Sequence, residues 1–192
     1  MKSEKDIITL PHANLRKRSQ KIGFIDESIN TLVQDMADAL LDWEANREHE
    51  VGVALAAVQI NSLKRVVIVR NDFDDKDDKT FMVFINPVIT KYEGKIIEDY
   101  EGCLSIKNIY GKVPRYDKVR VKALDQNGRE FRVKLTGFLA RILQHEIDHT
   151  NGIVFVDHIK NKEDAFYMLE KTGNLAPLDY KKDIENSDLW QK

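Results

Sequence analysis

Two histidines and a glutamate in the second half of the chain have the spacing of a metal site. His145, Glu146 and His149 match the pattern H-E-x-x-H. Residues four apart on a helix lie on one face with their β-carbons about 5–6 Å apart, so both imidazoles can bind one cation. The glutamate then lies near a water on that cation without binding the metal itself, which suits an acid and base. The alternative is a pair of surface histidines on an amphipathic helix, because this short pattern also occurs by chance.

A catalytic site of this type needs a third protein ligand and keeps one position for water. Downstream, Phe155 occupies the place where one related pattern has a histidine, and His158 lies three residues too late. Glu163 and Glu170 are formal candidates, although nothing distinguishes them from exposed charge. Upstream, Cys103 follows a glycine in a turn-prone segment, where it can approach a metal as a thiolate. A lone cysteine is also often a small buried hydrophobe. The residue types alone therefore leave open whether the third ligand lies upstream or downstream of the two histidines.

Three short motifs occur in a fixed order along the chain. They are GVALAAVQ at 52–59, EGCLS at 101–105 and QHEIDH at 144–149. With these motifs the chain resembles the peptide deformylase family, and the likeness extends from about residue 4 to 160. Three motifs in order are far more specific than any one of them. We therefore interpret the chain as a member of this family.

The resemblance implies a metal-dependent amidase that removes the formyl group from formyl-methionine at the start of new polypeptides and releases formate. It implies one divalent ion bound by Cys103, His145 and His149. The expected ion is Fe²⁺ in the cell, with Zn²⁺, Ni²⁺ or Co²⁺ as substitutes, because the ligand types alone do not decide the metal. The expected partner is an N-formylmethionyl peptide, with the ribosome near the nascent-chain exit as a further candidate.

The resemblance also implies roles for the residues around the metal. Glu146 is expected to accept a proton from the attacking water and pass it to the departing amine. The Gln59 side-chain amide and the Leu104 backbone N–H are expected to donate to the oxyanion. We further expect Glu101 to pair with Arg115 and hold the cysteine loop, against the alternative of two unrelated surface charges.

Substrate contacts follow from the same resemblance. The family binds its peptide in an extended form beside the first motif, which predicts contacts with Val53 and Ala54. The methionine side chain is expected in an apolar pocket lined by Phe138, Arg141 and Ile142, although Phe138 and Ile142 suit an ordinary core equally well. Ala54 replaces the second glycine of the first motif, and Arg141 brings a charge to the pocket. We therefore expect an active enzyme with altered peptide preference.

Composition and charge limit the class of protein. The 192 residues suit one catalytic domain over 1–192, with 173–192 as a mobile or docked tail, and 42% apolar and 32% charged residues are typical of globular chains. The net charge of −2 argues against DNA binding, and no apolar stretch suggests a membrane span. The single cysteine excludes an intrachain disulfide and fits a reducing compartment. We expect a cytoplasmic monomer.

The sequence pattern predicts an α+β fold in which mostly antiparallel sheets pack around a central metal-binding helix, with N-terminal and C-terminal helices. The helical patterns lie at 26–45, from Thr136 to about His149, and at 161–173. The extended patterns lie at 52–60, 65–70, 81–88, 119–124 and 130–135. The last two flank Asp125-Gln126-Asn127-Gly128, which favours a hairpin.

Two other functions remain open from the sequence. An H-E-x-x-H endopeptidase would take its third ligand downstream and would not need Cys103. A binding module could keep the fold and the metal without turnover, which only Ala54 and Arg141 favour.

Overall fold

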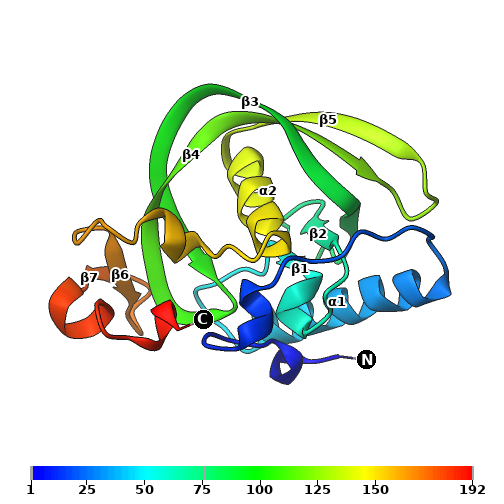
Figure 1. The fold of residues 1–192 in the computed structure, drawn as a ribbon. Helices are drawn as coiled ribbons and strands as arrows, with labels where there is room; N and C mark the ends of the chain where they lie inside the picture. Colours follow the sequence, from blue (N-terminus) through cyan, green and yellow to red (C-terminus); the bar gives the residue numbers. More distant parts are fainter. Residues whose placement is uncertain (1, 76, 192) are drawn as a thin grey trace.

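The computed structural model describes residues 2–75 and 77–191 and has an α+β architecture (Figure 1). Two α-helices and seven strands make up most of it. They are α1 (Glu27–Ala45), β1 (Ala54–Ala56), β2 (Val66–Arg70), β3 (Phe81–Cys103), β4 (Ile106–Leu124), β5 (Glu130–Thr136), α2 (Gly137–Thr150), β6 (Phe166–Leu169) and β7 (Leu175–Pro177). The strands form one antiparallel sheet in the order β1-β2-β3-β4-β6-β7, with β5 beside β4. None of the helices in this part of the chain combines the length and apolar character that a membrane span requires.

Strand β2 is covered on both faces, which explains its uninterrupted run of β-branched residues. Val66 and Ile68 pack in the cluster that contains α1, whereas Val67 and Val69 pack in the cluster that contains α2. Because successive side chains of a strand point to opposite faces, a strand between two helices needs apolar residues at every position. The β1–β2 end of the sheet therefore separates α1 from α2.

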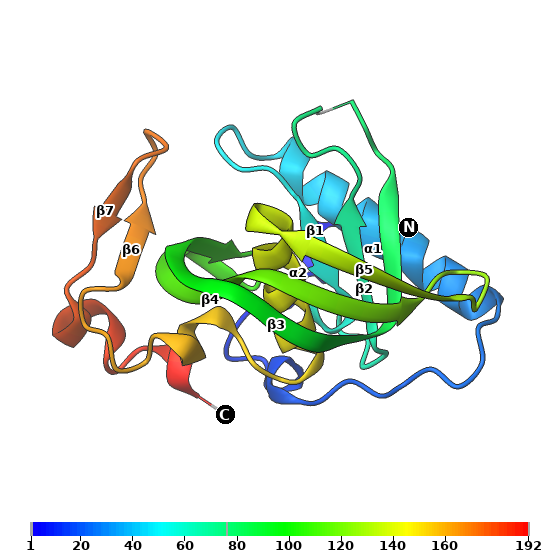
Figure 2. The same cartoon turned by 90° about the horizontal axis from the view of Figure 1, so that it is seen from above.

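Helix α2 lies inside the curve of the sheet. Strands β3 and β4 arch over it, and β5 continues the arch (Figures 1 and 2). The residues from Ala140 to Ile147 are all buried, including the polar ones. Thr136 takes the N-cap position, and Gly152 follows the helix with a φ of 77°, which glycine adopts without strain. The predicted central helix, and its end near His149, are confirmed.

Most of the other predicted elements are also confirmed, with different lengths. Only residues 54–56 of the expected extended segment 52–60 form a strand, and Ala57–Ile60 form a 3₁₀ helix. The strand predicted at 81–88 continues to Cys103. Pro87 does not end it, because Asn86 has a φ of 53° and the pairing with β4 shifts register at this point. A bulge removes the need for the ladder hydrogen bond that proline cannot donate.

The helix predicted at 161–173 is wrong. Residues Phe166–Leu169 form β6, which pairs with Ile109–Gly111 of β4 and with β7. Phe166 is buried, and Tyr167 makes an edge contact with Tyr100. Sheet pairing and the burial of Phe166 therefore outweigh local helix propensity. After β7, the helical structure of the described residues consists of two short turns, at Tyr180–Ile184 and Asp188–Trp190.

The last described residues pack against strand β6. Ile184 and Leu189 are buried in one cluster with Phe166, and Trp190 packs against it. The Trp190 indole N–H donates to the Ile184 carbonyl at 2.8 Å. A single catalytic domain over 1–192 stays a prediction, and residues 1 and 192 lie outside the part that the structure describes.

We expect Phe166→Ala to lower the free energy of unfolding by about 3–5 kcal/mol, because it leaves a cavity under the C-terminal strands. Phe166 is 1% exposed, whereas Phe24 is 79% exposed and serves as the matched control. Phe24→Ala should stay within about 0.5 kcal/mol of the unchanged chain. Urea unfolding measures both. Equal effects of the two substitutions would contradict the packing described for the C-terminal segment.

Candidate metal centre and active site

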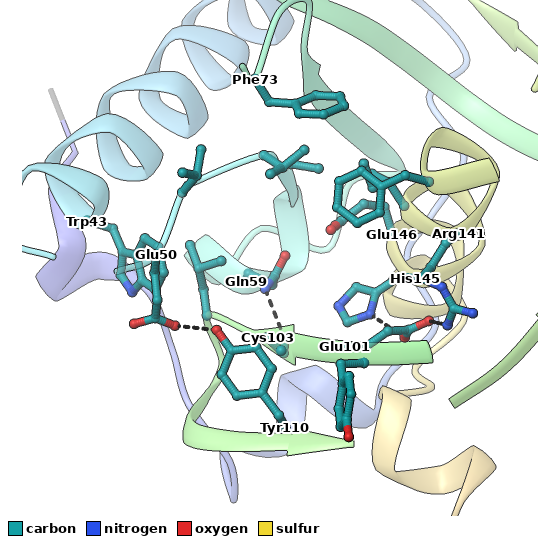
Figure 3. Close-up of a pocket in the computed structure, with 18 of the residues that line it drawn as sticks. Trp43, Glu50, Gln59, Phe73, Glu101, Cys103, Tyr110, Arg141, His145 and Glu146 are labelled. Atoms are coloured by element: carbon teal, nitrogen blue, oxygen red, sulfur yellow. Dashed lines mark hydrogen bonds and ion pairs between the residues drawn. The ribbon is translucent and has the colours of Figure 1, made fainter. Parts of the chain in front are cut away.

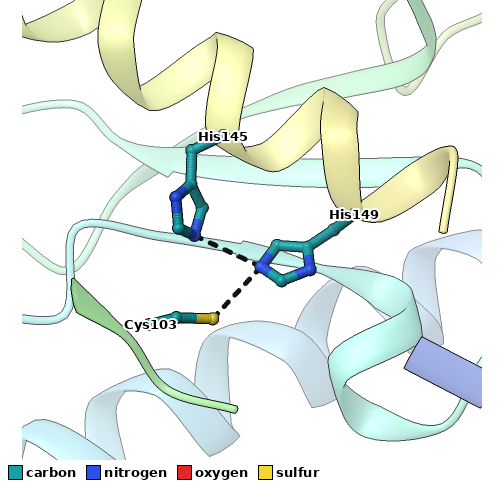
Figure 4. A group of neighbouring side chains, drawn as sticks. All are labelled: Cys103, His145 and His149. Carbon is teal, nitrogen blue, oxygen red and sulfur yellow. Dashed lines mark hydrogen bonds between the residues drawn. The ribbon is translucent and has the colours of Figure 1, made fainter. Parts of the chain in front are cut away.

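Helix α2 presents two imidazoles on one face, one turn apart. The Nε2 atoms of His145 and His149 lie 3.2 Å apart, and the rings meet edge to face (Figure 4). Both side chains are buried. Burial and the charge of His145 hold the pKa of His149 well below its ordinary value. A neutral imidazole is the form that binds a metal, so this environment favours His149 as a ligand.

The end of β3 brings Cys103 to the same place. Its Sγ atom lies 3.2 Å from Nε2 of His149, and the ligand atoms of all three residues lie within 4.8 Å of one another (Figure 4). Gly102 permits this approach, because a β-carbon there would lie 2.6 Å from the Tyr110 ring. Among the described residues, the upstream cysteine rather than a downstream glutamate joins the histidines.

The three ligand atoms suit one divalent cation. Sulfur and nitrogen ligands in a tetrahedral site at about 2.0–2.3 Å from the metal lie about 3.3–3.7 Å from one another. The Sγ–Nε2 and Nε2–Nε2 separations of 3.2 Å are close to that range, and the third separation does not exceed 4.8 Å. One thiolate and two imidazoles make a site with three protein ligands, which leaves a fourth position for water or substrate.

Glu101 joins the metal centre to the sheet. Its Oε2 atom lies 3.0 Å from Nδ1 of His145, and both carboxylate oxygens accept from Arg115, at 3.0 and 3.1 Å. Burial alone would raise the pKa of Glu101, but the hydrogen bond with His145 and the charge of Arg115 outweigh it and hold the pKa below its usual range. The predicted contact between Glu101 and Arg115 is therefore present as a buried, bidentate ion pair.

Arg115 continues this network toward the surface. It also donates to Asp148 at 2.5 Å, and Asp148 lies 2.7 Å from Nε2 of His158. Asp148 thus orients its neighbours from a place beside the ligand His149. Sequence reasoning did not find His158 in this role, because the chain reaches it only through the 3₁₀ helix Phe155–His158.

Glu146 lines the cavity beside His145 (Figure 3). Its side chain is buried, and its Oε2 atom has no hydrogen-bond partner among the described residues. Burial raises the pKa of Glu146 to about 7. A carboxyl group with a pKa near neutral can both accept and return a proton, which an acid–base catalyst must do.

The expected oxyanion donors lie next to the cysteine. Gln59 is buried, and its Oε1 atom accepts from the Ala56 N–H at 2.9 Å. This contact directs Nε2 toward Cys103 Sγ at 3.6 Å and Ser105 Oγ at 3.3 Å. Leu104 follows the cysteine and lines the same cavity. The fold thus brings together Gln59 and Leu104, which are 45 residues apart in the sequence.

A cavity of about 460 Å³ opens over this centre. All five predicted substrate-contact residues line it, namely Val53, Ala54, Phe138, Arg141 and Ile142. Ala54 is buried and packs in the α2 cluster. Arg141 lines the wall through its side chain, but its guanidinium group bonds to Glu101 at 2.7 Å. The predicted charge therefore points into the wall and not into the cavity (Figure 3).

Several lining residues were not predicted from the sequence. Tyr110 donates to Glu50 at 2.8 Å at one end of the cavity. At another side, Phe73 meets Phe138 edge to face with ring centroids 5.4 Å apart. Phe73 belongs to the acidic loop after β2, whose composition gave no sign of a contact with α2 (Figure 3).

A family model described as polypeptide deformylase matches residues 4–165. The chain belongs to this family. Members remove the N-terminal formyl group from new polypeptides, and the chain is an enzyme of this class. A peptide deformylase of Thermomicrobium roseum is 41% identical over 173 residues, which are 88% of this chain and 94% of that protein. Peptide deformylase 1 of Pseudomonas syringae pv. tomato is 40% identical over 81% of this chain and 87% of its own length.

Solved structures agree with this assignment. A deformylase of Synechococcus elongatus in complex with actinonin superposes with a TM-score of 0.74 at 32% identity, over 81% of this chain and 80% of that one. A deformylase of Legionella pneumophila gives a TM-score of 0.70 at 41% identity, over 79% and 83% of the two chains. The deformylase fold and the predicted family are confirmed.

The raised pKa of Glu146 predicts how stability depends on pH in the metal-free protein. The folded state keeps this proton at pH values where the unfolded chain releases it, so the contribution of Glu146 is complete below about pH 4.5 and is lost as the pH rises through about 7. Relative to Glu146→Gln, the unchanged chain should lose at most about 3 kcal/mol across this range. Urea unfolding from acidic to neutral pH measures the difference. Parallel pH profiles would contradict the raised pKa.

Proposed function

We propose that Cys103, His145 and His149 hold one divalent metal ion and that Glu146 acts as acid and base in deformylation of N-formylmethionyl peptides. The observation that supports this most directly is the meeting of the three ligand atoms within 4.8 Å of one another. Two of the three ligands, Cys103 and His145, line a cavity that the buried Glu146 also lines. The three ligands account for metal binding, and Glu146 accounts for proton transfer.

A divalent cation at these ligands activates water and polarises the formyl carbonyl when it is bound. Glu146 accepts a proton as the water oxygen forms its bond to the formyl carbon. Glu146 then returns that proton to the amide nitrogen as the C–N bond breaks. The products are formate and a free amino terminus, and the carboxylate is regenerated. The buried environment and the pKa of about 7 support both halves of this cycle.

Gln59 and Leu104 are proposed to stabilise the oxyanion. Donors aimed at the developing charge before the reaction begins need little reorganisation, which makes them effective. The contact from the Ala56 N–H to Gln59 Oε1 fixes the amide so that its NH₂ group faces the cysteine. The Leu104 backbone N–H belongs to the residue directly after Cys103.

The peptide is proposed to bind as an added strand along β1. This strand is at the end of the sheet order, so its outer edge has no strand partner in the described part of the chain. Val53 and Ala54 line the cavity there. An extended peptide that pairs with such an edge gains main-chain hydrogen bonds. The methionine side chain would then contact Phe138, Ile142 and the methylene groups of Arg141.

The resemblance supports Fe²⁺ as the metal in the cell, and the same ligands also accept Zn²⁺, Ni²⁺ or Co²⁺. We further propose that the chain works in the cytoplasm as a monomer, where nascent chains leave the ribosome. The reducing conditions of that compartment would protect a thiolate ligand. Residues 1–192 are proposed to act as one catalytic domain.

We expect Glu146→Gln to reduce formate release from a formyl-methionyl peptide by at least about 100-fold, because the variant can no longer accept a proton. The assay uses Fe²⁺-loaded protein handled without oxygen, and metal content is measured in parallel. The variant should keep its metal. Unchanged release with Gln at this position would contradict the role of Glu146.

Cys103→Ala distinguishes the alternatives in the same assay. A deformylase site should lose both metal and formate release, whereas an H-E-x-x-H endopeptidase with a downstream ligand should keep its metal. A binding module would keep the metal in the unchanged chain but release no formate from it.

Gln59→Leu is expected to lower kcat/KM by about 10²–10³ because one oxyanion donor is lost. Metal content should remain unchanged, because Gln59 is not a ligand. Ser62→Ala, at an unrelated position after the same 3₁₀ helix, is the matched control and should keep full activity. A fall in kcat/KM of less than threefold for Gln59→Leu would remove Gln59 from the mechanism.

A further inference from the structure

Arg141 is a buried cation one turn before the ligand His145. The residue is 6% exposed, and its guanidinium group is turned away from the cavity (Figure 3). Nη1 donates to Oε1 of Glu101 at 2.7 Å and to the Val113 carbonyl at 2.8 Å, and Nη2 donates to the Ile97 carbonyl at 2.7 Å. These three close hydrogen bonds hold the guanidinium group inside the cavity wall, so its charge does not face a substrate.

The Glu101 carboxylate therefore has two close donors on each oxygen. Oε1 accepts from Arg115 at 3.0 Å and from Arg141 at 2.7 Å. Oε2 accepts from Arg115 at 3.1 Å and contacts Nδ1 of His145 at 3.0 Å. Two oxygens offer about four acceptor sites, so this arrangement leaves the carboxylate little freedom to rotate.

The two contacts from α2 have a special geometry. Arg141 and His145 lie four residues apart on one helix face and bond to opposite oxygens of the same carboxylate. Arg115 comes from β4 and is shared with Asp148 at 2.5 Å. Arg141 is therefore the guanidinium group that ties Glu101 to the helix of the ligand itself. Without Arg141, the Glu101 carboxylate would be free to shift with Arg115 toward Asp148.

We propose that Arg141 is a positioning residue of the metal centre, which acts through Glu101 on the orientation of His145. This inference rests on the proposed function of Cys103, His145 and His149 as metal ligands. A carboxylate that accepts from Nδ1–H keeps Nε2 free for the metal and fixes the ring. Arg141 holds that carboxylate in place, so it contributes to metal affinity without contact with either metal or substrate.

The test measures the dissociation constant for Zn²⁺ by competition with a chelator, together with urea unfolding of the metal-free protein. Arg141→Met, which keeps most of the side-chain length, should weaken Zn²⁺ binding by about 10- to 100-fold. Arg141→Lys restores a charge near Glu101 and should recover part of the loss. Arg70→Met is the matched control, because Arg70 is also buried and paired with a carboxylate, Glu44, but belongs to β2. It should lower stability and leave Zn²⁺ affinity within about twofold.

A double-mutant cycle shows whether Arg141 acts through Glu101. In a Glu101→Gln background, Arg141→Met should change Zn²⁺ affinity by less than threefold. Affinity within twofold of the unchanged chain for Arg141→Met alone would overturn the proposal, and so would an equal loss in both backgrounds. If the unchanged chain did not bind Zn²⁺ at all, both the proposed metal site and the role of Arg141 would be overturned. If the unchanged chain binds Zn²⁺ and Arg141→Met has no effect, only the role of Arg141 is overturned.

Discussion

The buried carboxylate of Glu101 is the contact on which the geometry of the site depends. Glu101 and Cys103 lie two residues apart near the end of β3, whereas the histidines lie on α2. The bond between Glu101 and His145 therefore fixes the strand that carries the thiolate relative to the helix that carries the imidazoles. A buried charge is stabilising only when its partners satisfy it fully. Two guanidinium groups and an imidazole meet that condition here.

The central helix combines deep burial with polar residues, and most of these are satisfied by the surrounding strands. Gln144 illustrates this, because its amide accepts from the Tyr116 N–H at 3.1 Å and donates to the Tyr116 carbonyl at 2.8 Å. By contrast, Oε2 of Glu146 and Nδ1 of His149 are buried atoms without a hydrogen-bond partner within the described ranges. Unsatisfied buried polar atoms are costly and uncommon, so their presence on two residues of α2 at the ligand cluster points to the reacting centre.

Local patterns predicted the parts of the molecule in which local and tertiary preferences agree. The central helix followed from helical spacing and a terminal glycine, whereas the pair Glu101–Arg115 was expected together with the family motifs. The C-terminal strand β6 was missed because its pairing with β4 joins residues more than 50 positions apart. Arg141 was expected to bring a charge to the pocket. Its carbonyl partners on β3 and β4 depend on the arch of the sheet, which no local pattern reports.

X-ray absorption spectroscopy of the metal-loaded protein tests the central claim most directly, because it counts the ligand atoms around the metal. The site described here predicts one sulfur at about 2.3 Å and two imidazole nitrogens at about 2.0–2.1 Å, with a light atom in the remaining position. Cys103→Ser should remove the sulfur shell and keep the nitrogen shell. A spectrum of the unchanged chain without sulfur, or with a carboxylate in its place, would contradict the assignment of Cys103, His145 and His149 as the metal ligands.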